Sequence, residues 1–270
     1  MNDRLRDDSR TGRAPWLKAL AWLALIAGLA IGAVALAAPV GVWLGLWDFR
    51  TGFQLLFSVA SPWGDTVAIA AAVTGVVVVL LAAVLRTGNA VKLGVLAFAG
   101  ALIAWAGHAV PESYRPDESV PPIHDISTDT EDPPQFVDVL PLRADAPNTT
   151  EYGGSPDMTP ERLAELTREA YPDVTTVTLP VPPEQAFERA LAAVEELGWE
   201  LVAAAPEDGR IEATDTTFWF RFKDDVVIRI RAADGGSEID ARSVSRVGGG
   251  DAGTNAARLR EFFERLEESG

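Results

Sequence analysis

The chain has 270 residues, of which 48% are hydrophobic, and its 39 acidic and 23 basic residues give a formal net charge of −16. The charge is concentrated in residues 111–270, where 34 acidic residues face 15 basic ones, a local balance of −19. Nucleic acids repel a segment of this charge, so nucleic-acid binding is excluded as its role. The chain has no cysteine, and His124 is the only histidine after residue 110. Thiol catalysis and His-rich metal sites are therefore excluded too.

Three long apolar runs occupy the first part of the chain. Residues 19–47 carry no charge over 29 positions, and runs 66–85 and 93–110 follow. A helix of about 20 apolar residues crosses the hydrocarbon core of a bilayer. We therefore expect three transmembrane helices, at about 17–47, 66–85 and 91–110, with the lipid bilayer as the partner of this part.

Basic residues set the expected orientation of these helices. The tail of residues 1–15 is rich in arginine, and the link between the second and third runs holds Arg86 and Lys92. The link between the first two runs holds Arg50 as its only base. By the positive-inside rule the tail and the second link face the cytoplasm. Three crossings then place residues 111–270 outside the inner membrane, in the periplasm or an equivalent space.

The first run has an alternative interpretation as a signal peptide. Basic residues, an alanine-rich stretch and Ala35-Leu36-Ala37 before Ala38 resemble the parts of a cleavable signal. The run is longer than a typical signal core, which favours an uncleaved helix. Either outcome leaves the soluble part outside.

Gly28 and Gly32 form a small-xxx-small step within the first run. Glycines at this spacing let helix backbones approach closely. The step either packs the three helices of one chain together or supports self-association of two chains.

The following segment, residues 111–173, contains 11 prolines. Proline at this density prevents helices and central strands and leaves an extended chain. Apolar residues within 123–129 and 136–140 nevertheless need a surface to lie on. We expect the segment to be draped over the folded domain, with disorder as the alternative, and a short helix to open at Thr159.

Residues 174–270 are expected to form an α+β domain of order β-α-β-β-β-β-α, preceded by the all-α three-helix transmembrane anchor. The architecture is an antiparallel sheet with two helices on one face, which permits a helix-grip arrangement around an apolar pocket. The expected strands are 174–179, 199–204, 210–215, 218–222 with 226–231, and 237–244; the expected helices are 182–197 and 254 onward.

One hairpin of this sheet can be placed in register. A two-residue turn at 234–235 pairs Arg231 with Glu238 and Arg229 with Asp240. Opposite charges that face each other across strands are mildly stabilising. We interpret this ion-paired face as a solvated face of the sheet.

The candidate binding site is a corner where a strand runs into a glycine-rich loop and then a helix. Side chains alternate along the strand, so two arginines share one face near the helix N-terminus, where backbone N–H groups favour anions. The hypothesis is that they hold a carboxylate or phosphate of a small anionic or lipid-like ligand. The alternative is structural: acids neutralise the arginines, and an acid caps the helix. The candidate residues are Arg242, Ser243, Ser245, Arg246, Asp251 and Asn255, with His124 and Asp125 from the preceding segment.

Signals for catalysis are weak. A Ser-His-Asp set could use only His124, and no serine has the context of a nucleophile elbow. The loop matches neither the phosphate-binding nor the dinucleotide fingerprint. We predict no catalytic residue, no metal ligand and no cofactor.

Several short motifs follow one another along the soluble part. They are Ile123-His124-Asp125-Ile126-Ser127-Thr128-Asp129, Ala170-Tyr171-Pro172-Asp173, Gly198-Trp199-Glu200, Ile211-Glu212-Ala213, Phe222 with Asp224-Asp225-Val226, and the run from Asp240 to Gly248 followed by Asp251, Gly253, Asn255 and Arg258. In this order they resemble a bacterial family known as domain of unknown function 1499, over about residues 112–267. The resemblance implies no activity or cofactor, but it implies that motif 123–129 belongs to the folded domain.

The expected function is that of an integral inner-membrane protein whose outer domain binds a small or lipid-like ligand, or organises the cell envelope, without catalysis. One alternative is an envelope enzyme that acts on an acyl or phosphoryl group through His124 and the 242–255 corner; another is a pure scaffold. A cavity behind the sheet would favour binding, and polar side chains converging around His124 would favour catalysis. A solid core with neither would favour the scaffold.

Overall fold

The computed structural model describes residues 14–113, 115, 120–154 and 158–268. The chain divides into two compact units, Met1–Arg115 and Pro116–Gly270. The expected cytoplasmic tail lies outside the described residues up to position 13.

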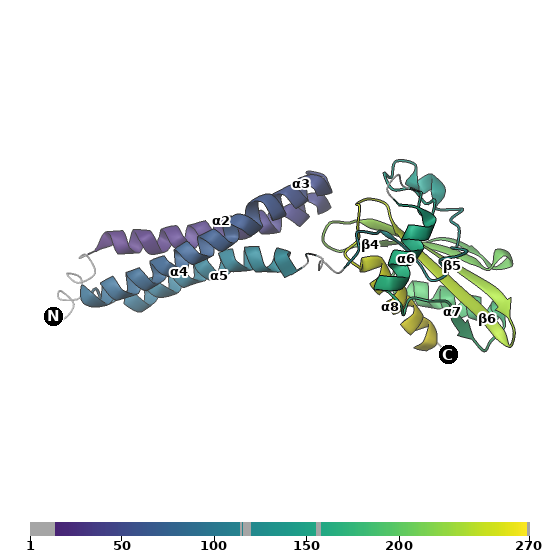
Figure 1. Ribbon diagram of the computed structural model, residues 1–270. Coiled ribbons are helices and arrows are strands. Elements are labelled where there is room, and N and C mark those ends of the chain that lie inside the picture. The colour runs from purple at the N-terminus through teal and green to yellow at the C-terminus, as the bar shows by residue number, and fades with distance from the viewer. Residues whose placement is uncertain (1–13, 114, 116–119, 155–157, 269–270) are drawn as a thin grey trace. The chain divides into compact units, whose positions relative to one another are not determined.

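The first unit is all-helical, as expected, and contains three helices that are long and apolar enough to cross a membrane (Figure 1). These helices span Pro15–Trp43, Phe49–Val84 and Ala90–Ser113. Its elements are α2 (Pro15–Trp43), α3 (Phe49–Gln54), the π-helical turn η1 (Leu55–Ala60), α4 (Ser61–Val84) and α5 (Ala90–Ser113).

The second of these helices begins well before the apolar run that predicts it. Asp48 caps it, since the Asp48 side chain accepts a hydrogen bond from the Thr51 N–H at 2.9 Å. From Phe49 the helix continues through η1 into α4 for 36 residues, which at 1.5 Å per residue is about 54 Å and longer than a hydrocarbon core of about 30 Å. The prediction from hydropathy begins this helix at about Thr66, because hydropathy does not take the Asp48 cap into account.

Small residues set the spacing between α2 and α5. A Cβ added to Gly28 would lie 2.1 Å from the Gly100 carbonyl oxygen, and one added to Gly100 would lie 2.3 Å from the Ala24 carbonyl oxygen. A Cβ on Gly32 would lie 2.8 Å from the Ile103 side chain. Both glycines of the small-xxx-small step thus make contacts within one chain; self-association through them stays a prediction.

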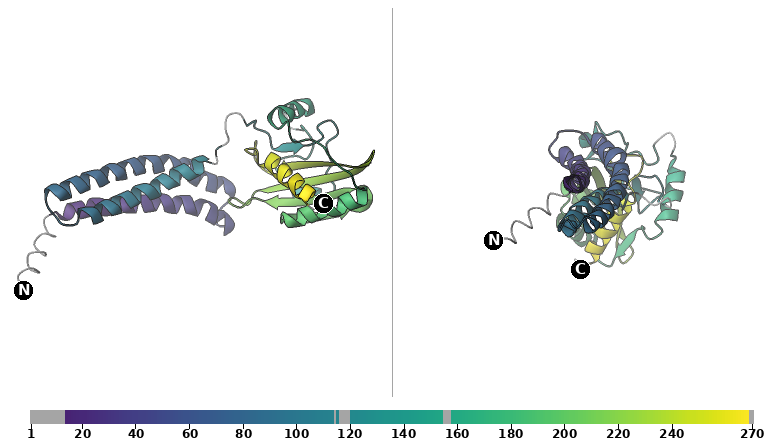
Figure 2. Two further views of the ribbon diagram at one scale, coloured as in Figure 1. Left: turned by 90° about the horizontal axis from the view of Figure 1, so that it is seen from below. Right: turned by 90° about the vertical axis from the view of Figure 1, so that its left-hand side faces the viewer.

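The second unit is an α+β domain built on one antiparallel sheet, so the predicted fold class is confirmed (Figures 1 and 2). The strand order is β1-β6-β5-β4-β3, and β2 also pairs with β6. The strands are β1 (Asp125–Ser127), β2 (Val177–Leu179), β3 (Glu200–Ala205), β4 (Arg210–Thr216), β5 (Lys223–Ala233) and β6 (Gly236–Ser245). The helices are η2 (Leu140–Arg143), α6 (Pro160–Ala170), α7 (Pro183–Glu196), η3 (Pro206–Asp208) and α8 (Thr254–Glu268).

Helices α7 and α8 lie together on one face of the sheet (Figure 2). Phe262 and Leu259 of α8 are fully buried against strand residues such as Ile228 and Ile239. Trp199, just before β3, stacks on Phe262 with ring centroids 6.0 Å apart. Large apolar side chains of α8 and the sheet thus bury one another at the position where a helix-grip fold would hold its pocket.

The opposite face of the sheet is covered by the proline-rich segment. Phe136 and Val139 form a buried cluster with Val227 of β5 and Val244 of β6. The fully buried Glu212 carboxylate of β4 accepts hydrogen bonds from three successive backbone N–H groups of this segment. The donors are Val137 at 2.8 Å, Asp138 at 3.1 Å and Val139 at 2.8 Å.

The β5–β6 hairpin has the predicted register, with Arg231 opposite Glu238 and Arg229 opposite Asp240. The interpretation of this face as solvated is wrong at Asp240, although Arg231 is exposed. Asp240 is fully buried, and its carboxylate lies 2.9 Å from Arg229 and 3.1 Å from Arg231. Asp129 adds a 3.0 Å contact to Arg229, so the Arg229–Asp240 pair lies under the covering segment.

Two further elements differ from the sequence prediction. Residues 218–222 form the turn of the β4–β5 hairpin rather than a strand, and β5 begins at Lys223. Asp125–Ser127 pairs with β6 as an additional edge strand. Three residues are too few to show an alternating pattern, which is why the sequence does not predict this strand.

Candidate functional site

The predicted corner comprises the end of β6, the loop that follows it and the start of α8. The loop is closed by Asp251, whose carboxylate accepts hydrogen bonds from the Gly253 N–H at 2.9 Å and the Asn255 N–H at 2.8 Å. These bonds use the N–H groups that an anion would need at this helix end. Burial raises the pKa of Asp251 despite the two N–H donors.

Arg246 is held by an acid of the neighbouring strand. Its Nε and Nη2 each lie 2.8 Å from an oxygen of Asp225, and its Nη1 donates to the Leu142 carbonyl at 3.0 Å. The hydrogen bond to Asp225 raises the pKa of Arg246. The guanidinium is therefore already paired in the two-pronged geometry that would recognise a ligand carboxylate.

Asp225 is fully buried and also binds a second arginine. Arg143 of η2 lies 2.6 Å from it, and the Thr214 hydroxyl donates to it at 2.6 Å. Burial disfavours the charge on Asp225, but the hydrogen bonds from Arg246, Thr214 and Arg143 hold the pKa of this carboxyl below its usual value. Burial lowers the pKa of Arg143, against the opposing effect of Asp225.

Arg242 is fully buried on the same face of β6. Its Nε and Nη2 donate to the two oxygens of Asp125 at 2.9 and 2.8 Å. Its carbon Cζ lies 5.4 Å from the Phe136 ring centroid and 5.3 Å from that of Tyr152, within the range of cation–π attraction. Burial raises the pKa of the Tyr152 hydroxyl to about 12.

The serines lie on the other face of β6, under α8. The Ser243 hydroxyl donates to the Asn255 side-chain oxygen at 2.6 Å, and the Asn255 amide donates to the Ser245 hydroxyl at 2.9 Å. The Asn255 amide also donates to the His124 carbonyl at 3.0 Å. Arg258 donates to Ser243 at 3.1 Å. These contacts fasten α8 and the segment before β1 to the end of β6.

The strand alternation is thus as expected, with the arginines on one face and the serines on the other, but each arginine has its own carboxylate. Arg242 is paired with Asp125 and Arg246 with Asp225. The carbonyl oxygen of His124 accepts hydrogen bonds from the Asn255 amide and from the Ser245 N–H. Within the described residues no group of three or more His, Cys, Asp and Glu residues could hold a metal ion. The observed pairs correspond to the structural alternative for this corner.

Comparison with known families identifies the domain that carries this corner. A family model described as "Protein of unknown function (DUF1499)" matches residues 125–266, more than half of the chain. The chain belongs to this family. The predicted resemblance is confirmed, and the match runs from β1 to α8, so the DUF1499 domain includes the segment that covers the sheet. No curated protein matches the chain.

Two arginines of the DUF1499 corner are missing from the predicted site. Arg258 lies on the buried face of α8 and binds Asp224 at 2.6 Å; its spacing of three from Asn255 and four from Phe262 places it on that face and could have revealed it. Arg143 comes from the covering segment, and its pairing with Asp225 has no local sequence signal.

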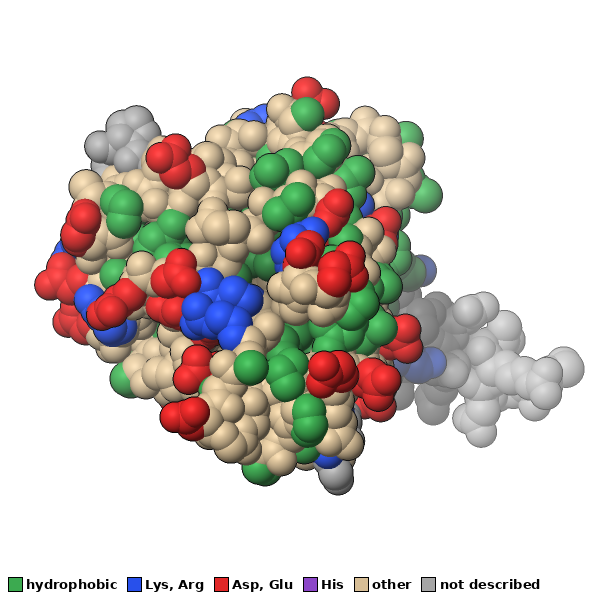
Figure 3. All heavy atoms as spheres, turned by 90° about the vertical axis from the view of Figure 1, so that its right-hand side faces the viewer, with side chains coloured by type: hydrophobic (Ala, Val, Ile, Leu, Met, Phe, Trp, Pro, Cys, Tyr) green, Lys and Arg blue, Asp and Glu red, His purple; other side chains and the backbone are tan. Residues whose placement is uncertain are grey.

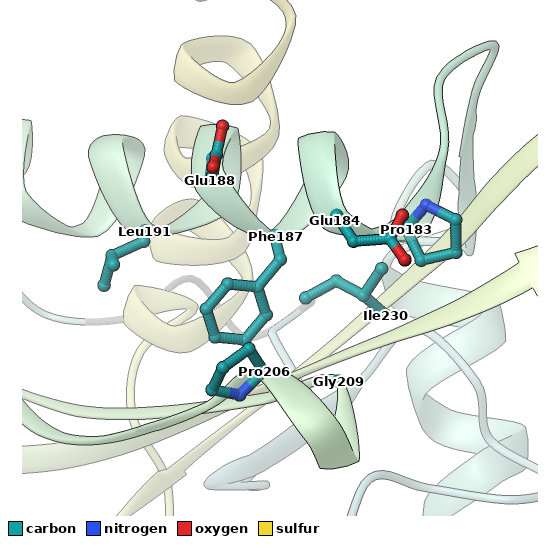
Figure 4. Close-up of a pocket in the computed structure, with 8 residues that line it drawn as sticks. All are labelled: Pro183, Glu184, Phe187, Glu188, Leu191, Pro206, Gly209 and Ile230. Carbon is teal, nitrogen blue, oxygen red and sulfur yellow. The ribbon is translucent and has the colours of Figure 1, made fainter.

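The DUF1499 domain also has an open groove that the sequence does not predict (Figure 4). Its volume is about 330 Å³. Phe187 and Leu191 of α7 face Pro206 and Gly209 across it, as Figure 4 shows. The remaining lining residues are Pro183, Glu184, Glu188 and Ile230. The groove lies near the β3–β4 turn, at the opposite end of the sheet from the corner, and α8 does not line it.

Proposed function

We propose that this protein is an integral inner-membrane protein whose DUF1499 domain acts outside the cytoplasm as a non-catalytic interaction module of the cell envelope. The observation that carries the proposal is the internal pairing of the corner. The polar groups best suited to bind or transform an anion, Arg242, Arg246 and the N-terminus of α8, are each bonded to a carboxylate of the domain itself.

The location rests on charge and on aromatic side chains. Arg86 and Lys92 flank the short link between the second and third helices, whereas residues 111–270 have a balance of −19. Trp16 and Trp43, near the two ends of α2, are exposed side chains of the kind found at both membrane–water interfaces. The helices themselves allow membrane anchoring, and the base distribution favours the outer side for the domain.

The pairing of buried arginines with buried carboxylates supports the non-catalytic character of the domain. Arg143, Asp225 and Arg246 form one group, and Arg258 joins Asp224 in a second. Such groups fix the covering segment and α8 to the sheet and give the domain a rigid shape. On the face shown in Figure 3, acidic side chains are spread widely and basic ones lie beside them. This surface suits a partner with basic or neutral groups.

The location can be tested with reporter fusions to the full chain. A reporter that is active only in the periplasm is fused after Gly270, and a second is inserted between Arg86 and Lys92. We expect activity at the first position and none at the second. The reverse pattern would place the domain in the cytoplasm and overturn the proposed function.

A second candidate function, binding of a small lipid-like ligand, is favoured by the groove beside α7. A volume of about 330 Å³ is at the lower end of the range for ligand sites, about 300–1,000 Å³. Glu184 and Glu188 at the groove favour a neutral or cationic head over an anionic one. The proposed ligand is an acyl chain with an uncharged head.

Monoolein is a suitable neutral probe for this groove, with oleate as the anionic comparison. Native mass spectrometry of the full chain should detect more bound monoolein than oleate, and Leu191→Gln should reduce the bound monoolein. Leu201→Gln, at an exposed leucine of β3, is the matched control and should leave it unchanged. If both variants and the parent bound equal amounts of monoolein, the groove would be ruled out as the ligand site.

A further inference from the structure

The β4–β5 hairpin ends in a cluster of aromatic residues, which we call the aromatic tip (residues 217–222). Its sequence after Thr217 is Phe218-Trp219-Phe220-Arg221-Phe222. Phe218 is 62% exposed and Trp219 46% exposed. Among the described residues of the second unit, these are the exposed aromatic side chains. A cluster of large aromatic side chains at the surface marks a binding surface more often than a lone exposed residue does.

The aromatic tip has a defined backbone conformation. The Thr217 N–H donates to the Phe222 carbonyl at 2.8 Å, and the Phe222 N–H donates to the Thr217 hydroxyl at 2.9 Å. Arg221 takes the left-handed conformation, with φ of 56°, that closes the turn. Phe218 and Trp219 pack edge to face with ring centroids 5.1 Å apart. A loop that is already ordered in this way loses little conformational entropy when it binds.

The strand register places the aromatic tip at the same end of the sheet as the first residue of β1. Thr216 pairs with Lys223, and Asp224 pairs with Ser245. At the same end Asp125, the first residue of β1, pairs with Val244. Residues 120–124, which lead into β1, therefore reach the sheet at the same end as the aromatic tip.

The chain that leads into this end is a short tether. The third apolar helix ends at Ser113, and only the seven residues 114–120 separate it from Pro121. Fully extended, such a stretch spans at most about 25 Å. A tether of this length keeps the end of the sheet that bears the tip at a high local concentration near the bilayer.

The charges around the aromatic tip favour a lipid surface although the domain as a whole is acidic. Arg221 is exposed, and the adjoining Asp224 and Asp225 are buried in ion pairs with arginines. Lys223 is exposed too, and its Nζ lies 3.5 Å from the carboxylate of the exposed Glu200. The tip itself, residues 217–222, therefore presents aromatic rings and one base, Arg221. Tryptophan and phenylalanine favour the headgroup region of a bilayer, and long basic side chains extend from it to lipid phosphates.

We propose that the aromatic tip is a membrane-docking element that inserts Phe218 and Trp219 into the interfacial region of a phospholipid bilayer. Docking gives the tethered domain one orientation, with the groove end of the sheet turned away from the lipid. The proposal needs only that the chain is anchored in a membrane. It therefore stands whichever side the reporter fusions assign to the domain.

The absence of cysteine allows a direct test with single labels. The full chain is reconstituted in phosphatidylcholine nanodiscs with a nitroxide attached at Trp219→Cys or, as the control, at Asp234→Cys. Asp234 lies in the β5–β6 turn, at the other end of the sheet. Collisions of each label with oxygen, which concentrates in lipid, are compared with collisions with a water-soluble nickel complex. Thermal melting verifies that both variants are folded.

We expect the label at position 219 to favour oxygen several-fold over the nickel complex and the label at position 234 to show the reverse. Adding Phe218→Ser to the first variant should shift its label toward the nickel complex. A label at position 219 that is as accessible to nickel as the one at position 234 would overturn the proposal. So would a label shielded from both reagents in detergent as well as in nanodiscs, because that result assigns the tip to a protein contact.

Discussion

Arg246 and Asp225 form a two-pronged ion pair that joins β6 to β5, with both nitrogen–oxygen distances at 2.8 Å. Arg143 binds the same carboxylate from the covering segment at 2.6 Å. The three charges depend on one another, because each is costly to bury without the others. The corner that the sequence singles out is thus a joint that holds strand, loop and covering segment together.

The first prediction concerns the stability of this joint. Arg246→Gln should lower the free energy of unfolding by about 2 kcal/mol, since it removes one of the two arginines that compensate the buried Asp225 charge and leaves only Arg143. Urea denaturation of the full chain in detergent, followed through the far-ultraviolet signal of the sheet, measures the change. Arg162→Gln is the control: its pair with Glu165 is exposed, and its loss should cost less than about 1 kcal/mol. Equal effects of the two substitutions would mean that the Arg246 pair is not a structural joint.

The second prediction concerns acid unfolding. The folded-state pKa of Asp225 lies below its ordinary value, near 3.9 when unfolded. Its ionised form therefore contributes stability that is fully present above about pH 4 and is lost as the pH falls through the lower folded-state pKa. In Arg246→Gln the pKa of Asp225 should rise, because the hydrogen bond from Arg246 is one cause of the depression. The acid-unfolding midpoint should therefore move to higher pH, and an unchanged midpoint would contradict this account.

The third prediction concerns the covering segment. Glu212→Gln should release residues 137–139, because a neutral amide oxygen cannot accept all three N–H groups that now bind the carboxylate. Hydrogen bonds to a charged group contribute about 1.5–3 kcal/mol each. Hydrogen exchange should accelerate at these three amides. It should remain slow in Glu200→Gln, where an exposed carboxylate lies 3.5 Å from Lys223. Unchanged exchange in Glu212→Gln would show that apolar contacts alone hold the segment.

The α+β domain is predictable from the sequence where periodicity and turns decide the structure. The alternation in β5 and β6, with a two-residue turn at 234–235, fixes the register that the structure shows. The apolar stripe of α8, including Leu259 and Phe262, likewise predicts the face that packs on the sheet. These features depend on neighbours close in sequence.

The parts that the sequence does not predict depend on distant partners. Arg229 and Asp240 are correctly paired, but only the three-dimensional contact with Asp129 shows that they are covered. Asp225 binds Arg143, which lies 82 residues earlier in the sequence. No local pattern around either residue indicates that contact. The sequence therefore predicts that the two arginines share one face of a corner, but their carboxylate partners become visible only in the fold.

The last prediction concerns the membrane helices and separates packing within a chain from self-association. Gly28→Leu should weaken the contact of α2 with α5, since a Cβ at Gly28 would already lie 2.1 Å from the Gly100 carbonyl oxygen and two packed helices cannot absorb that overlap. Thermal denaturation in mild detergent should show a lower midpoint, whereas Ala30→Leu, on an exposed face of α2, should leave it unchanged. Light scattering of the same samples reports the oligomeric state. A parent dimer that Gly28→Leu converts to a monomer with an unchanged melting midpoint would instead assign Gly28 to an interface between two chains.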